Sequence, residues 1–314
     1  MGLAFLFPGQ GSQAVGMGAD LAAAFAPARA VFEEVDEALG QSLFKLMRDG
    51  PIEDLTLTEN AQPALMAVSL AVIRTLELEF GVDIRRADFI AGHSLGEYSA
   101  LAAAGALSLA DTARLLRLRG QAMQRAVPVG EGAMASLIGP KSDVALAETA
   151  AAAGAEVGVC VVANDNNTGN VVISGDKAAV DLAIETAKTL GAKAIVLNVS
   201  APFHCPLMQP AADEMAEALA AATIIAPRAP LVTNVTARPV LDPELIRRLL
   251  VEQVTGRVRW RESITWLAGE GGVTRFGEAG AGKALTGMAR RIAPDAAAVA
   301  LNTPADIEAF AKSL

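Results

Sequence analysis

One serine in a glycine-bounded turn is the residue of this sequence best suited to nucleophilic chemistry. Gly92, Ser94 and Gly96 fit the pattern G-x-S-x-G, with a short apolar run before them and a helical pattern after them. In such a strand-turn-helix frame the serine lies at the N-terminus of a helix. Free N–H groups and the helix dipole there favour the negative charge that develops on an attacked carbonyl oxygen. The pattern therefore predicts attack by Ser94 on an acyl carbonyl.

A serine hydroxyl needs a base, and the chain contains only two histidines. His93 adjoins Ser94 in a tight turn, where successive side chains diverge, so we expect it to pack or to hydrogen-bond locally. A lone histidine such as His204 is usually structural. Because it is the remaining base for a well-framed serine, His204 is predicted to take the proton of Ser94.

No acidic residue between Ser94 and His204 stands out as the third member of a hydrolase triad. A different acceptor is available further along the chain. Asp242 as N-cap, Pro243 in the first turn and Gly256 after the end predict a helix. The last carbonyls of that helix, near Gln253, have no partner within it and are candidates to accept the second N–H of His204.

An arginine is predicted to face the core from a helix that starts at Ser108 and stops before Pro128. At 100° per residue, Arg119 lies at the centre of the apolar stripe. A buried guanidinium needs a partner, either a core Asp or Glu or the carboxylate of a substrate, and we favour the substrate because a serine nucleophile is predicted nearby. The opposite face is expected to be solvated, and it carries Arg114, Arg117, Gln121 and Arg125.

Alternating strand and helix patterns must position these residues. Apolar runs at 3–7 and 87–91 predict strands, and the patterns at 60–80 and 95–104 predict helices, which together indicate a parallel sheet with helices on its faces. From 131 to 199 the order is strand, helix, strand, strand, helix, strand, typical of a ferredoxin-like unit. The strands are expected at 132–139, 157–164, 171–175 and 192–199, the helices at 143–154 and 177–191, and a turn at 165–170.

We therefore predict two structural units. Residues 1–129 and 200–314 form an α/β core, and residues 130–199 form an inserted ferredoxin-like (βαββαβ) subdomain. The cleft between the two units is the expected place for a site.

Composition limits the class of protein. The 314 residues are 52% hydrophobic, enough for the large core of a soluble globular enzyme. A formal net charge of −9 argues against nucleic-acid binding, because nothing would neutralise a row of phosphates. Two cysteines without partners at metal-ligand spacing predict neither a disulfide framework nor a metal site and fit a reducing cytoplasm. The apolar run near the N-terminus is too short for a signal peptide or a membrane span.

Seven segments, in order along nearly the whole chain, resemble the malonyl-CoA:acyl carrier protein transacylases. They are FPGQGSQ at 7–13, QPAL at 62–65, GHSLGEYSAL at 92–101, RGQAM at 119–123, NVVISG at 170–175, FHCPLM at 203–208 and FGEAGAGKALTGM at 276–288. The resemblance implies an α/β-hydrolase-like core with a ferredoxin-like insert. This fold agrees with the two units predicted from periodicity.

The resemblance also implies a role for each site residue. Ser94 would carry the malonyl group, His204 would act as base and then acid, and Arg119 would bind the malonyl carboxylate. The backbone N–H groups of Gln10 and Leu95 would form the oxyanion hole. The main-chain carbonyl of Gln253 would orient His204 in place of an acidic residue.

The implied reaction is a ping-pong transfer from malonyl-CoA to the phosphopantetheine thiol of acyl carrier protein, serving fatty acid elongation. It needs no cofactor and no metal, and we expect a cytoplasmic monomer that binds neither nucleic acid nor membrane. Because the carrier is acidic, the arginine clusters of the C-terminal half, such as GRVRWR at 256–261 and ARRI at 289–292, are candidates for its docking surface.

Two other functions remain open from the sequence. The first is a hydrolase that uses the same Ser94 and His204, although an inward Arg119 would disfavour neutral acyl groups. Polyketide and malonate-decarboxylase acyltransferases also share these motifs. The second is nucleotide binding, because residues 277–283 fit G-x-x-x-x-G-K after an apparent strand. The next residue is Ala284 instead of the Ser or Thr that holds magnesium, so we do not favour it.

Overall fold

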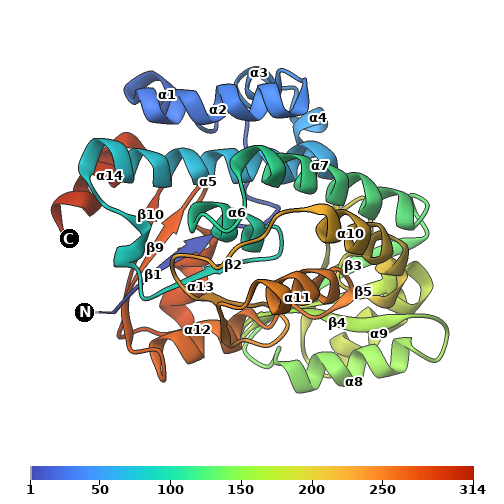
Figure 1. Ribbon diagram of the computed structural model, residues 1–314. Coiled ribbons are helices and arrows are strands. Elements are labelled where there is room, and N and C mark those ends of the chain that lie inside the picture. The colour runs from blue at the N-terminus through green and yellow to red at the C-terminus, as the bar shows by residue number, and fades with distance from the viewer. Residues whose placement is uncertain (1) are drawn as a thin grey trace.

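The computed structural model describes residues 2–314 and contains two separate sheets (Figure 1). The larger sheet has the strand order β10-β9-β1-β2-β7-β8, and its neighbours run parallel except for β7 and β8. Its strands are β1 (Gly2–Phe7), β2 (Phe89–Gly92), β7 (Leu231–Val232), β8 (Pro239–Val240), β9 (Val273–Ala279) and β10 (Ala297–Leu301). The predicted parallel sheet is confirmed.

Strand β1 lies inside the sheet and is apolar on both faces. Leu3, Phe5 and Phe7 point into one hydrophobic core, whereas Ala4 and Leu6 point into another, as the two-residue period of a strand requires. The second core is completed by α12 (Trp260–Ala268) and α13 (Ala284–Ile292). A strand covered on both sides in this way holds the loop that follows it in a fixed place.

The larger core, on the other side of the sheet, is formed mainly by helices (Figure 1). Long helix α5 is buried along most of its length, as predicted for residues 60–80. The helices that contribute to this core are α1 (Ala19–Ala24), α2 (Ala26–Leu39), α3 (Leu43–Asp49), α4 (Ile52–Thr56), α5 (Thr58–Phe80), α6 (Gly96–Ala103), α7 (Leu109–Ala126), α10 (Gln209–Ala221), α11 (Pro243–Thr255) and α14 (Pro304–Lys312), with short 3₁₀ turns η1 (Ile84–Arg86) and η2 (Pro206–Met208).

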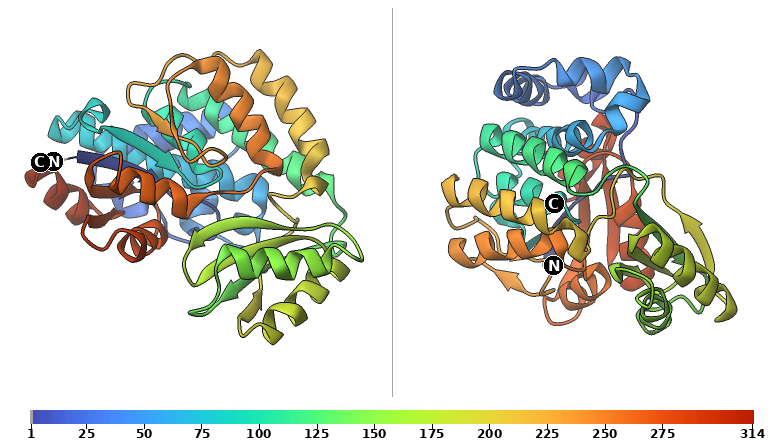
Figure 2. Two further views of the ribbon diagram at one scale, coloured as in Figure 1. Left: turned by 90° about the horizontal axis from the view of Figure 1, so that it is seen from below. Right: turned by 90° about the vertical axis from the view of Figure 1, so that its right-hand side faces the viewer.

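The smaller sheet is antiparallel, with the strand order β4-β5-β3-β6. Its elements follow the predicted order along the chain: β3 (Gly132–Ile138), α8 (Val144–Gly154), β4 (Cys160–Asn167), β5 (Asn170–Asp176), α9 (Lys177–Thr189) and β6 (Lys193–Val196). Helices α8 and α9 pack on one face of this sheet, and Figure 2 shows the unit lying beside the larger one. Its other face carries Met134, Ala163 and Val172, against which Phe203 packs.

A seam of hydrogen bonds joins the two units where a turn was predicted at 165–170. The predicted turn is present but shorter, at residues 168–169, because strand β4 continues to Asn167. The N–H of Asp165 donates to the carbonyl of Val258 at 2.9 Å, and the N–H of Val258 donates to the carbonyl of Ala163 at 2.8 Å. The buried Asp165 carboxylate also forms an ion pair with Arg261 at 2.9 Å. These tertiary contacts override the turn preference of Asp and Asn.

The polar face of α7 is less exposed than predicted. Arg114 and Arg125 are exposed and form ion pairs with acidic residues, but Arg117 is half-buried, so its predicted solvation is wrong. Its Nε and Nη2 atoms are buried without a hydrogen-bond partner among residues 2–314. The reason is that α2, α5 and α10 all pack against α7 and cover part of that face.

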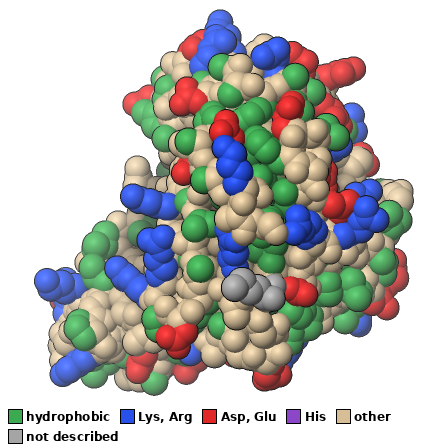
Figure 3. Space-filling model, turned by 90° about the vertical axis from the view of Figure 1, so that its left-hand side faces the viewer, with side chains coloured by type: hydrophobic (Ala, Val, Ile, Leu, Met, Phe, Trp, Pro, Cys, Tyr) green, Lys and Arg blue, Asp and Glu red, His purple; other side chains and the backbone are tan. Residues whose placement is uncertain are grey.

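The surface carries mixed charge. On the face shown in Figure 3, acidic and basic side chains lie between one another. The three arginines at 257, 259 and 261 form ion pairs with acidic residues of the chain itself, Glu148, Glu262 and Asp165. Among residues 2–314, no helix combines the length and the apolar character that crossing a bilayer requires.

Close packing makes glycine necessary in the turn between β2 and α6. A Cβ atom on Gly92 would overlap the backbone of Gly96, and a Cβ atom on Gly96 would overlap the carbonyl oxygen of Phe7. Strand β1, strand β2 and helix α6 therefore lie so close together that only glycine, which has no Cβ atom, fits at these two positions.

We predict that Gly96→Ala destabilises the protein by about 1–3 kcal/mol, because the new methyl group must displace the main chain of Phe7. Gly287→Ala is the matched control. Gly287 lies within α13 with open space around it, so this change should stabilise the fold by roughly 0.5–1 kcal/mol. Urea unfolding of the two variants checks both signs. Equal effects would contradict the packing described for the turn.

Candidate active site

The serine turn is held in a left-handed backbone conformation. Ser94 has a φ of 54°, a conformation that costs on the order of 1–2 kcal/mol for a residue other than glycine. The Asn234 side chain supports both ends of the turn: its Oδ1 accepts from the N–H of Ser94 at 2.7 Å, and its Nδ2 donates to the carbonyl of Gly92 at 2.6 Å. The turn is thereby fixed with the Ser94 hydroxyl pointing into a cavity.

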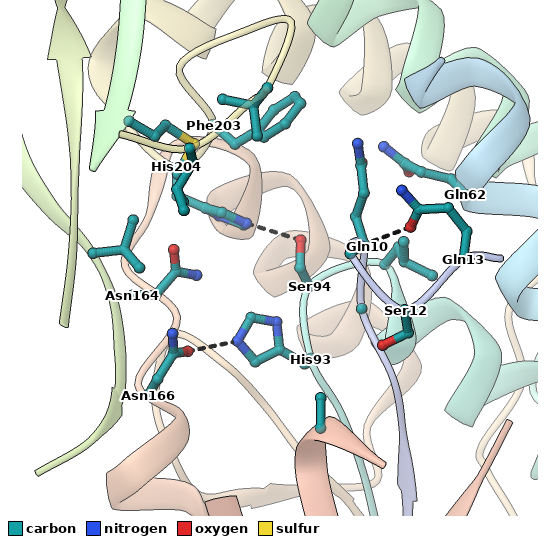
Figure 4. Close-up of a pocket in the computed structure, with 18 of the residues that line it drawn as sticks. Gln10, Ser12, Gln13, Gln62, His93, Ser94, Asn164, Asn166, Phe203 and His204 are labelled. Carbon is teal, nitrogen blue, oxygen red and sulfur yellow. Dashed lines mark hydrogen bonds between the residues drawn. The ribbon is translucent and has the colours of Figure 1, made fainter. Parts of the chain in front are cut away.

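The structure brings His204 to Ser94 (Figure 4). Its Nε2 lies 2.8 Å from Ser94 Oγ, and its Nδ1 lies 2.9 Å from the carbonyl oxygen of Gln253 and 3.1 Å from that of Gly256. Carbonyl oxygens only accept hydrogen bonds, so Nδ1 carries the proton and Nε2 is left bare. The imidazole is therefore oriented to accept the proton of Ser94, and the C-terminal end of α11 holds it there without an acidic residue.

The surroundings of His204 keep its imidazole neutral. Burial lowers its pKa to about 3, and the positive charge of Arg119 acts in the same direction, while the hydrogen bonds to the carbonyls of Gln253 and Gly256 partly oppose them. A neutral imidazole is the form that can accept a proton, and His204 keeps this form throughout the neutral pH range.

Arg119 is buried beside the serine, with an exposed fraction of 1%. Its Nη1 donates to Gln62 Oε1 at 2.9 Å, and its Nη2 donates to Gln253 Oε1 at 2.8 Å and to Ser94 Oγ at 3.1 Å. Among residues 2–314 it makes no ion pair, so the alternative of a core Asp or Glu as direct partner is wrong. Two side-chain amides take that place, and the guanidinium charge is left for another anion.

Behind the serine lies a set of contacts that the sequence patterns did not predict. The Gln253 side chain donates from Nε2 to the carbonyl of Ser94 at 2.9 Å and also to Glu97 Oε2. The other oxygen of Glu97 accepts from the N–H of Asn234 at 2.6 Å. One feature of the sequence could have identified Glu97: it is the charged residue of α6, whose sequence GEYSALAA contains no other charged side chain.

Two effects act in opposite directions on the Glu97 carboxyl. Burial raises its pKa to about 8, while hydrogen bonds from Asn234 and Gln253 and the charge of Arg119 favour the ionised form. Both oxygens accept from N–H donors, and these contacts favour the ionised carboxylate against the effect of burial.

His93 turns away from the reacting atoms. Its Nε2 lies 2.9 Å from Asn166 Oδ1, and its ring centroid lies 5.5 Å from that of Trp260. Asn166 belongs to β4 of the smaller sheet. His93 therefore packs and hydrogen-bonds as predicted and adds a second link across the seam between the two units.

A cavity of about 340 Å³ opens in front of Ser94. Gln10 and His204 lie on opposite sides of the serine (Figure 4), and Leu95 also lines the cavity. Within residues 2–314, the backbone N–H groups of Gln10 and Leu95 make no hydrogen bond. The wall contributed by the smaller unit and its connection to the core is mainly apolar, with Met134, Val172, Leu197, Val199 and Phe203, and it also carries the polar side chains of Asn164, Asn166 and Asn198.

The segment that resembles a phosphate-binding loop is filled by the chain itself. Glu278 is buried, and its two carboxylate oxygens accept from the N–H groups of Leu285 at 3.1 Å and Thr286 at 2.6 Å, at the start of α13. A glutamate thus occupies the helix N-terminus where a phosphate would bind. In the part of the chain that the structure describes, no group of three or more His, Cys, Asp and Glu side chains is arranged to hold a metal ion.

The family follows from comparison with known proteins. Residues 4–278 match the family model of the acyl transferase domain, so the chain belongs to this family. It is 45% identical over 313 residues to the malonyl CoA-acyl carrier protein transacylase of Bacillus subtilis (strain 168), an alignment that covers 99% of this chain and 97% of that protein. The family resemblance predicted from the sequence motifs is confirmed.

Solved structures agree with this assignment. An acyl-carrier-protein-S-malonyltransferase from Bartonella henselae superposes with a TM-score of 0.97 at 55% identity and covers 100% of this chain and 99% of its own. A malonyl-transacylase in complex with a type II PKS acyl-carrier protein gives a TM-score of 0.96 at 41% identity, covering 100% of both chains.

The depressed pKa of His204 predicts acid sensitivity of the fold. An unfolded histidine takes up a proton near pH 6.5, whereas folded His204 does so only near pH 3, so unfolding binds an extra proton between these values. Stability should fall as pH decreases from about 6.5, with His204 contributing up to about 1.4 kcal/mol per pH unit. The His204→Asn variant keeps an N–H donor at this position but has no side-chain group that takes up a proton in this pH range. Unfolding free energies between pH 4 and 7 should show a shallower slope for this variant, and an unchanged slope would contradict the assignment.

Proposed function

We propose that this protein transfers a malonyl group from malonyl-CoA to the phosphopantetheine thiol of acyl carrier protein and so supplies fatty acid elongation. The observation that carries the proposal is a serine hydroxyl placed between a neutral imidazole and a buried guanidinium without an ion-pair partner. The names of the relatives support it, and one structural relative is a malonyl-transacylase in complex with an acyl-carrier protein.

In the first half-reaction, Ser94 Oγ attacks the carbonyl carbon of the malonyl thioester. His204 Nε2, at 2.8 Å, takes the hydroxyl proton as the new C–O bond forms. The hydrogen bond from Arg119 Nη2 stabilises the negative charge that develops on Oγ during this step. When the tetrahedral intermediate collapses, the C–S bond breaks, and His204 returns the proton to the departing CoA sulfur.

The backbone N–H groups of Gln10 and Leu95 bind the oxyanion of this intermediate. Both line the cavity beside Ser94, and neither is used by another acceptor within residues 2–314. Leu95 lies at the N-cap of α6, so the helix dipole adds to the stabilisation. A donor held in place before the reaction costs no reorganisation when charge develops.

Arg119 binds the free carboxylate of the malonyl group. Its charge is buried and not compensated by an ion pair, and Nη1 has two N–H groups of which Gln62 takes one. A carboxylated acyl group supplies the missing anion, whereas an acetyl group leaves the guanidinium without one. This difference provides selectivity for malonyl over acetyl groups.

In the second half-reaction, the thiol of the carrier's phosphopantetheine attacks the malonyl-serine ester. His204 takes the thiol proton, the new C–S bond forms, and Ser94 Oγ leaves and recovers a proton from His204. Every proton transfer uses His204, which explains why one neutral base is sufficient for both directions. The reaction therefore proceeds by a ping-pong mechanism without a cofactor or a metal.

We assign the two units to known architectures as part of this proposal. Residues 1–129 and 200–314 form an α/β-hydrolase-like catalytic core, in which the nucleophile follows a central strand. Residues 130–199 form a ferredoxin-like insert, which fits the element order and the strand order β4-β5-β3-β6. We also propose that the protein acts as a cytoplasmic monomer.

Mass spectrometry of the intact protein after mixing with malonyl-CoA tests the function. The protein should gain one malonyl group, and Ser94→Ala should gain none. Adding phosphopantetheinylated carrier should remove the group from the protein and place it on the carrier. Rapid consumption of malonyl-CoA in water without a carrier would instead identify a hydrolase.

A further inference from the structure

Glu97 is connected to Arg119 through a single side chain. Gln253 donates from Nε2 to Glu97 Oε2 and accepts at Oε1 from Arg119 Nη2, at 2.8 Å. All three side chains are buried, with exposed fractions of 1% or less. A buried carboxylate and a buried guanidinium are thus joined by one amide, which lies directly behind Ser94 and donates to its carbonyl oxygen.

The direction of each hydrogen bond in this set is fixed. Arginine only donates, so the oxygen of the Gln253 amide must face Arg119. The nitrogen of the same amide must then face Glu97, which has to accept. The second oxygen of Glu97 faces the backbone N–H of Asn234, which is also a donor. Position 97 therefore needs two acceptors, and of the side chains of this size only a carboxylate provides them.

Glutamine at position 97 cannot satisfy this arrangement. If its NH₂ group faces Gln253, two donors meet, and Gln253 is driven to turn its amide over. The turned amide presents its NH₂ group to Arg119 and its oxygen to the carbonyl of Ser94, so both contacts are lost. If its NH₂ group faces Asn234, it meets a backbone N–H. The first orientation disturbs the guanidinium through Gln253, and the second puts two donors together at Asn234, beside the serine turn.

We propose that Glu97 is a positioning residue that sets the selectivity for carboxylated acyl groups, because it fixes the Gln253 amide and through it the orientation of Arg119. This inference rests on the proposed malonyl transfer. Glu97 touches neither Ser94 Oγ nor the cavity, and its effect reaches the substrate only through Gln253 and Arg119. Its loss should therefore weaken malonyl transfer more than acetyl transfer, because an acetyl group has no carboxylate for the guanidinium to bind.

A purely structural role makes a different prediction. Glu97 lies in the first turn of α6 and also binds Asn234, which supports the Ser94 turn. If Glu97 only stabilised this turn, its replacement would lower acylation by malonyl-CoA and by acetyl-CoA by the same factor. The ratio of the two rates separates the two roles.

The experiment measures kcat/KM for acylation of the protein by malonyl-CoA and by acetyl-CoA. For Glu97→Gln we expect the malonyl-to-acetyl ratio to fall about 10-fold or more, as for the loss of one charged hydrogen bond. Arg119→Ala gives the ratio for complete loss of the guanidinium. Glu97→Asp keeps two acceptor oxygens on a shorter side chain, and its ratio should lie between those of the unchanged protein and Glu97→Gln.

Glu278→Gln is the matched control. Glu278 is also a buried glutamate that accepts from two N–H donors at the start of a helix, but it has no hydrogen bond to the Gln253 and Arg119 set. We expect this variant to lower the unfolding temperature and to leave the malonyl-to-acetyl ratio within about twofold of the unchanged protein.

A double-variant cycle tests the route through Gln253. Gln253→Leu removes the connecting amide but keeps the main-chain carbonyl that orients His204. The malonyl-to-acetyl ratio of Gln253→Leu should fall as much as that of Glu97→Gln. The double variant should show no further fall in this ratio, because both changes interrupt the same route. Additive losses would overturn the inference, as would an unchanged ratio in Glu97→Gln. If Glu97→Gln does not fold, Gln253→Leu alone decides, and a malonyl-to-acetyl ratio equal to that of the unchanged protein would overturn the inference. Failure of the unchanged protein to prefer malonyl-CoA would instead refute the proposed function.

Discussion

A buried guanidinium held by neutral amides is the interaction on which the site depends. Moving an unpaired charge into a protein interior costs several kcal/mol, and the oxygens of Gln62 and Gln253 offset only part of this cost for Arg119. In the proposed reaction, the remaining demand for negative charge is met by the oxygen of Ser94 and by the malonyl carboxylate. The same charge helps to keep His204 neutral, so one side chain prepares nucleophile, base and substrate pocket together.

The rest of the fold keeps these groups from moving apart. Helix α7 supplies Arg119, β2 and α6 supply the serine turn, and the end of α11 supplies the carbonyls that hold His204. The segment after α11 also pairs with β4 through Val258, so the small sheet that lines one side of the cavity is anchored to the same stretch of chain that orients the base. Close backbone contact at Gly92 and Gly96 leaves little freedom for the serine.

Local patterns predict the parts of this site that depend on local structure. G-x-S-x-G between a strand and a helix identifies Ser94, the count of two histidines leaves His204, and helical periodicity places Arg119 on the buried stripe. Glu97 and Asn234 were missed because their contacts join residues 137 or more positions apart, which no periodicity reports. The turn predicted at 165–170 proved shorter, at 168–169, for a related reason, since pairing with Val258 and Arg261 extends a strand into residues that prefer turns.

Calorimetric titration of the Ser94→Ala protein tests the central claim most directly, because this protein can bind acyl-CoA but cannot be acylated. If the uncompensated charge of Arg119 recognises the acyl carboxylate, malonyl-CoA should bind at least about tenfold more tightly than acetyl-CoA, equivalent to about 1.4 kcal/mol. Equal affinities for the two thioesters would contradict the account.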